Sequence, residues 1–79
     1  MSKSPAVEVA ANVRAEMARR GITAQSLAET TGIARSTLIR RLSPKQQSSF
    51  LTVDELHAIA RALDLPLDVL IRIEQDALT

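Results

Sequence analysis

The chain has 79 residues, a net charge of only +1 and no cysteine, which together describe one small domain over residues 1–79 and exclude a disulfide framework or a thiolate metal site. Its single Phe, with no Trp or Tyr, predicts an aliphatic core and argues against proteins that stack single-stranded bases on aromatic side chains. No signal peptide or membrane-spanning segment is recognisable, so we expect a cytoplasmic protein.

The two halves of the chain carry opposite charge. Residues 1–45 hold eight bases and three acids, a net charge of +5, whereas residues 46–79 hold two bases and six acids, a net charge of −4. A fold with this polarity can turn one face toward phosphates and keep the other face away from them. The pattern favours a nucleic-acid partner for the N-terminal half.

Residues 5–20 are predicted to form the first helix. Ser4 is a suitable N-cap, Pro5 suits the first turn, and Gly21 suits the left-handed residue that follows a helix. Apolar residues recur at helical spacing and make one stripe that should face the core. This stripe comprises Ala6, Val9, Ala10, Val13 and Met17.

The segment TAQSLAETTGIARSTLIRRL, residues 23–42, predicts two short helices at a sharp angle. Thr23 is a good N-cap for the first helix, and Gly32 stands where the backbone must turn left-handed, which glycine does at least cost. The second helix should begin near Arg35 and present a basic face outward. Its core side should comprise Ile33, Leu38 and Leu42. This is the pattern of a helix-turn-helix.

A fourth helix is predicted over about residues 53–63, after a polar stretch. Thr52 as N-cap and Glu55 three residues later form a capping box at its start. The residues expected on its buried side are Val53, Leu56, Ile59, Ala60 and Leu63.

A last helix is predicted over about residues 67–78. Its apolar residues cover a wider arc than one small core needs, which predicts a contact with a second copy of the chain. The alternative is a fraying tail whose last turn buries nothing. The residues expected at the dimer contact are Leu70, Ile73, Ala77 and Leu78.

The residues LAETTGIARSTL, followed by DELHAIARALDLPLDVL, resemble the helix-turn-helix domains of the lambda-repressor and Cro-like (XRE-type) family of phage and bacterial regulators. The resemblance covers roughly residues 9–71. It implies a compact all-α fold of five helices that binds double-stranded DNA, with the helix-turn-helix at the second and third helices.

The third helix should supply the contacts to bases. Within a helix-turn-helix its N-terminal turn enters the major groove, where Arg35 can bond a guanine and Ile39 can touch a thymine methyl. The expected base contacts are Arg35, Ser36, Thr37, Ile39 and Arg40. Thr37 either faces DNA or supports the turn. The alternative for the whole set is a solvated basic helix face.

The contacts expected with the DNA backbone are Thr23, Ala24, Gln25, Arg41, Ser43, Lys45, Gln46 and Gln47. Ala24 stands where the family often has a phosphate-binding glutamine, so that contact must come from its neighbours or from backbone amides. Ala34 replaces the usual Ser or Thr cap of the third helix. Arg41 is expected either at the DNA backbone or in an ion pair with an acid of the fourth helix. The alternative for the loop that contains Lys45 is a mobile loop that contacts no partner.

We therefore expect a small transcriptional regulator, in its simplest form a repressor that occupies a two-fold related operator as a homodimer. The alternatives are an antitoxin-type protein-interaction module with autoregulatory DNA binding, or a phage recombination accessory factor. No nucleophile with a matched base, carboxylate pair or Gly-rich phosphate loop can be assembled, and His57 stands alone. Enzyme activity, a metal, a cofactor, a small-molecule ligand and a membrane partner are not expected.

Overall fold

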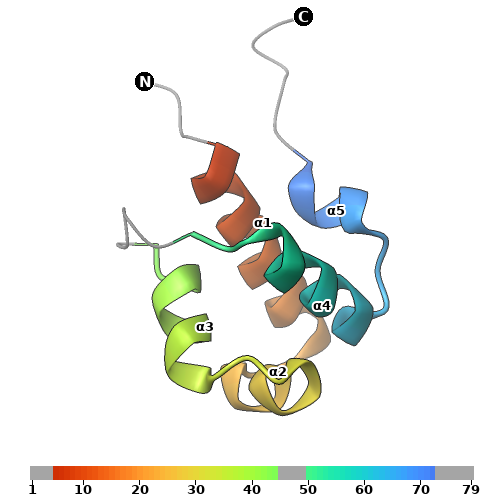
Figure 1. Ribbon diagram of the computed structural model, residues 1–79. Helices are drawn as coiled ribbons and strands as arrows, with labels where there is room; N and C mark the ends of the chain where they lie inside the picture. The colour runs from red at the N-terminus through yellow and green to blue at the C-terminus, as the bar shows by residue number, and fades with distance from the viewer. Residues whose placement is uncertain (1–4, 45–49, 73–79) are drawn as a thin grey trace, which may run out of the picture.

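The computed structural model describes residues 5–44 and 50–72, which form five α-helices and no strand (Figure 1). The helices are α1 (Pro5–Arg20), α2 (Ala24–Thr31), α3 (Arg35–Leu42), α4 (Val53–Leu63) and α5 (Leu67–Ile71). Figure 1 shows α2 and α3 together at the lower end of the molecule and α5 near the upper end, beside α1. The predicted all-α, five-helix architecture is confirmed for the described residues.

The core is aliphatic, as expected from a chain with one aromatic residue. It draws on every helix, and the described residues bury no polar or charged side chain. Its members are Val9, Ala10, Val13, Met17, Leu27, Leu38, Leu42, Leu56, Ile59, Ala60, Leu63 and Leu70. Four of them come from the predicted α1 stripe, whose fifth residue, Ala6, is half-buried.

Left-handed glycines end α1 and α2. Gly21 has a φ of 65°, and beyond it the Ile22 amide donates to the Met17 carbonyl oxygen at 2.9 Å. Gly32 has a φ of 80°, and its amide donates to the Ala28 carbonyl oxygen at 2.9 Å. The predicted left-handed residue in the helix-turn-helix is therefore present, and the chain turns there directly into α3.

The turn between α2 and α3 is also tied by a side chain. The Thr31 hydroxyl donates to the Leu27 carbonyl oxygen at 2.8 Å and accepts from the Ile33 amide at 3.1 Å. These bonds satisfy backbone groups on both sides of the glycine, so the angle between α2 and α3 does not depend on Gly32 alone.

The predicted capping box begins α4. The Thr52 hydroxyl accepts from the Glu55 amide at 3.0 Å, and Glu55 Oε1 accepts from the Thr52 amide at 2.9 Å. Val53 was expected in the core, but it is 74% exposed, so that prediction is wrong. Val53 is the first residue of the helix, and its side chain lies off the buried face that begins with Leu56.

The last described helix is shorter than predicted. The helix α5 ends at Ile71, because Arg72 already has extended backbone with a ψ of 126°. The prediction of one continuous helix over residues 67–78 is therefore wrong at Arg72, and residues 73–79 lie outside the described part. Leu70 was expected at a dimer contact, but its side chain is 0% exposed in the core of its own chain, so it has no surface to offer a partner.

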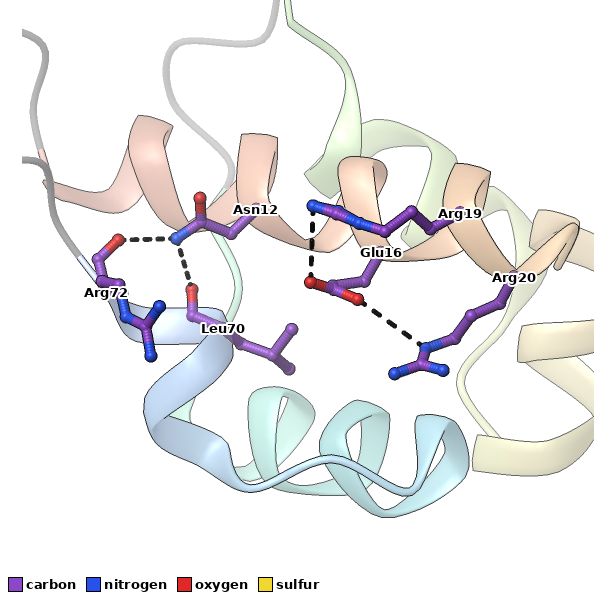
Figure 2. Close-up of polar contacts among 6 residues, drawn as sticks. All are labelled: Asn12, Glu16, Arg19, Arg20, Leu70 and Arg72. Carbon is purple, nitrogen blue, oxygen red and sulfur yellow. Dashed lines mark hydrogen bonds and ion pairs between the residues drawn. The ribbon is translucent and has the colours of Figure 1, made fainter.

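One asparagine fastens the end of α5 to α1. Asn12 Nδ2 donates to the Leu70 carbonyl oxygen at 2.9 Å and to the Arg72 carbonyl oxygen at 2.7 Å, as Figure 2 shows. The last carbonyls of a helix have no partner within the helix. Asn12 supplies one from a residue about 60 positions earlier, which holds the two ends of the described chain together.

Candidate nucleic-acid interface

The helix α3 is anchored by its inner face and presents polar and basic side chains on its outer face. Leu38 is 0% exposed and Leu42 is 6% exposed, so both are fixed in the core. Ser36 and Arg40 are exposed on the opposite side, and Arg35 is exposed at the first position of the helix. The exposure predicted for these three side chains agrees with the structure, while their contacts with DNA stay a prediction.

The other two expected base contacts differ in exposure. Ile39 is 45% exposed, so part of its apolar side chain is open to a ligand. Thr37 is half-buried, which is compatible with support of the turn as well as with contact to a ligand.

A shallow apolar groove lies beside Ile39, between α1, α2 and α3. Its other apolar lining residues are Met17, Ala18, Ile22, Ala24, Leu42 and Pro44. Arg14 and Ser43 are the polar residues at its edge. The sequence pattern did not indicate this groove, because its residues come from three helices. Periodicity within each helix does not reveal how the three pack together.

The start of α3 has no side-chain cap. Ala34 precedes the helix with a φ of −59° and a ψ of 140°, and it makes no capping hydrogen bond. This was expected from the alanine at a position where Ser or Thr usually stands. The positive end of the helix dipole therefore lies beside the exposed Arg35, so both favour a negatively charged ligand.

The start of α2 is capped within the chain. The Thr23 hydroxyl accepts from the Ser26 amide at 3.1 Å, as expected for an N-cap. Gln25 Nε2 donates to Glu29 Oε2 at 3.0 Å along the exposed side of the helix, and Ala24 is half-buried. Of the three residues expected at the DNA backbone here, Thr23 and Gln25 are exposed and already make local bonds.

Arg41 does not share the environment of its neighbour Arg40. Its Nε lies 2.8 Å from Glu55 Oε1, and the side chains are only 22% and 18% exposed. Of the two interactions expected for Arg41, the structure contains the intramolecular ion pair with α4. The pair links the last turn of α3 to the first turn of α4.

A second side chain holds the same end of α3. Arg14 Nη1 donates to the Leu42 carbonyl oxygen at 2.7 Å, so α1 supplies a partner for the last residue of α3. The sequence did not predict this role of Arg14, because the residue type of a long, flexible side chain in α1 does not indicate which group it will contact. Its only signal is a basic residue beside the buried stripe of a helix.

Two further bases lie in the last turn of α1. Arg19 and Arg20 both approach the carboxylate of Glu16, at 3.6 and 3.7 Å respectively (Figure 2). Arg19 is the more exposed, with 62% of its side chain accessible. The Glu16 side chain is only 15% exposed, and its single negative charge is shared by the two arginines, so the group keeps a net positive charge.

Most of the remaining predicted site residues lie outside the described part of the chain. Ser43 is half-buried after α3, whereas Lys45, Gln46 and Gln47 lie outside the described residues. The same holds for the remaining predicted dimer contacts, which are Ile73, Ala77 and Leu78. Their expected contacts stay predictions.

Residues 5–44 and 50–72 were also compared with the requirements of a metal site and of a membrane span. No group of three or more His, Cys, Asp or Glu side chains there is arranged to hold a metal ion. Within the same ranges, no helix has the length and apolar character that crossing a bilayer requires.

A comparison with protein families agrees with this geometry. A model described as the Cro/C1-type HTH DNA-binding domain, where HTH stands for helix-turn-helix, matches residues 12–76. The match begins within α1 and includes all of α2 to α5. Searches of the curated proteins and of the solved structures found no match.

Proposed function

Because the chain belongs to the family of Cro/C1-type HTH DNA-binding domains, we propose that it is a sequence-specific transcriptional regulator, and that it represses by occupying an operator. The observation that carries the proposal is the division of α3 into two faces. Leu38 and Leu42 fix the helix in the core, while Ser36 and Arg40 are exposed on its outer side. Arg35 is exposed at the first position of the helix, one turn before Leu38.

The chemistry of that outer face suits the major groove. An α-helix fits the groove, and an arginine near its start can donate two hydrogen bonds to the O6 and N7 of a guanine. The uncapped start of α3 adds the positive end of the helix dipole at the same place. Ile39 offers an exposed apolar surface to a thymine methyl group.

In this proposal the protein binds two half-sites as a homodimer. The eight residues of α3 are enough to read only a few base pairs, and a two-fold axis doubles the length of DNA that is read. Ile71 at the end of α5 is 43% exposed and supplies apolar surface for such a contact.

Binding selection and competition test the proposal. Duplexes enriched by the wild-type protein from a randomised pool are competed against an unrelated duplex of equal length, at two salt concentrations. We expect a clear preference for the enriched duplex and affinities that fall steeply with salt. Arg35→Ala should lower the preference at one base position in each half-site by about 1–3 kcal/mol.

Arg61→Ala is the matched control, because it removes an exposed arginine from α4, in the acidic half of the chain. It should leave the base preference unchanged. The proposal is rejected if the wild-type protein shows no preference between enriched and unrelated duplex at any salt concentration.

A further inference from the structure

One carboxylate oxygen serves both α3 and α4. Glu55 Oε1 accepts from the Thr52 amide at 2.9 Å within the capping box and also lies 2.8 Å from Arg41 Nε. The Glu55 amide is in turn bound by the Thr52 hydroxyl at 3.0 Å. The carboxylate is therefore held in place by the start of α4 before Arg41 meets it, so Glu55 loses little additional side-chain entropy when the pair forms.

The pair is sheltered, in contrast to the other arginines of α3. Arg41 and Glu55 side chains are 22% and 18% exposed, whereas Arg35 and Arg40 are exposed. Salt screens a partly covered pair less than it screens contacts at an open surface. The ion pair between Glu55 and Arg41 can therefore persist at salt concentrations that already weaken contacts with DNA phosphates.

We propose that Glu55 is a positioning residue of the DNA interface, which holds Arg41 away from DNA phosphates and so limits the sequence-independent part of the affinity. Arg41 adjoins Arg40 in the last turn of α3, and if it is released its long side chain gains an additional phosphate contact. Phosphate contacts raise the affinity for every sequence and steepen its dependence on salt. The inference rests on the proposed function, because it concerns the same DNA-binding face.

Glu55→Gln tests the inference, since glutamine keeps an oxygen that can accept from the Thr52 amide but loses the charge that pairs with Arg41. The measurement is the affinity for a random-sequence duplex between 50 and 200 mM salt. We expect the variant to bind this duplex more tightly than wild type at the lower salt. Between 50 and 200 mM salt its affinity should fall by a factor about three times larger than that of wild type, which is the salt effect expected for one additional phosphate contact.

Three controls isolate the role of Arg41. Asp54→Asn removes an exposed acid one position away and changes the net charge equally, but it should leave the salt dependence as in wild type. Thr52→Ala weakens the capping box without touching the charges and should also leave it unchanged. The single variant Arg41→Gln should leave the salt dependence unchanged. Combined with Glu55→Gln, it should cancel the gain in affinity for the random-sequence duplex.

Circular dichroism of each variant at the assay temperature establishes that all compared molecules are folded. The inference is overturned if Glu55→Gln leaves the salt dependence of wild type unchanged, or if Asp54→Asn steepens it equally. Failure of the proposed function gives a different result, because the wild-type protein then shows no preference for any enriched duplex.

Discussion

The left-handed turn at Gly32 offers a direct test of how the helix-turn-helix is held. In Gly32→Val a β-branched residue must adopt a φ of 80°, a conformation that such residues strongly resist. A Cβ placed there meets no atom within 4 Å, so the cost is that of the backbone alone and not of a collision.

The expected loss follows from two opposing terms. Backbone strain of this kind costs about 1–3 kcal/mol, and the lower entropy of the unfolded valine chain returns about 0.4–1 kcal/mol. With both terms near the middle of their ranges, the net loss of unfolding free energy is about 1–2 kcal/mol. For a domain of this size that corresponds to a fall in melting temperature of about 4–16 °C.

Thermal and urea unfolding followed by circular dichroism measure this loss, with Gly32→Asn as the matched control. Asparagine adopts the left-handed region more readily than other non-glycine residues, so it should lose clearly less stability than valine. Equal losses for the two variants would refute the reasoning, since the effect would then come from something other than the left-handed backbone.

Three further predictions concern α3, α5 and oligomerisation. Arg40→Ala should change the unfolding free energy by no more than about 0.5 kcal/mol while weakening DNA binding, and a variant that unfolds would mean that this face of α3 is an inner one. Asn12→Ala removes two hydrogen bonds to the end of α5 and should lower the free energy of unfolding in urea by about 1–3 kcal/mol. A variant as stable as wild type would show that these two hydrogen bonds contribute nothing. Replacing Ile73 and Leu78 together with Glu should convert a wild-type dimer to a monomer in sedimentation with the helical signal retained, and a wild type that is monomeric at high micromolar concentration would contradict the dimer proposal.

Local patterns of the sequence were sufficient to predict most helix boundaries. Thr23, Gly32 and Thr52 act on backbone groups within four residues of themselves, so their identities alone define a cap or a turn. The inner face of α3 followed from apolar spacing for the same reason. These features require no knowledge of how distant segments pack.

The features that could not be predicted depend on contacts between distant segments. Asn12 and Arg14 find their acceptors in α5 and at the end of α3, and nothing in either residue type encodes the partner. Val53 has the residue type of a core position but lies in the first turn of its helix, off the buried face. A wide apolar arc predicted a longer α5, but hydrophobic spacing does not reveal where a helix stops when no glycine marks its end.

The central claim is that the outer face of α3 binds DNA, and amide chemical-shift mapping tests it most directly. The labelled wild-type protein is titrated with a duplex enriched from a randomised pool, and the shift changes are compared along the chain. We predict the largest changes between Arg35 and Arg40, with little change at the exposed residues of α4 and α5. Large changes confined to α4 and α5, with the signals of α3 unaltered, would contradict the claim.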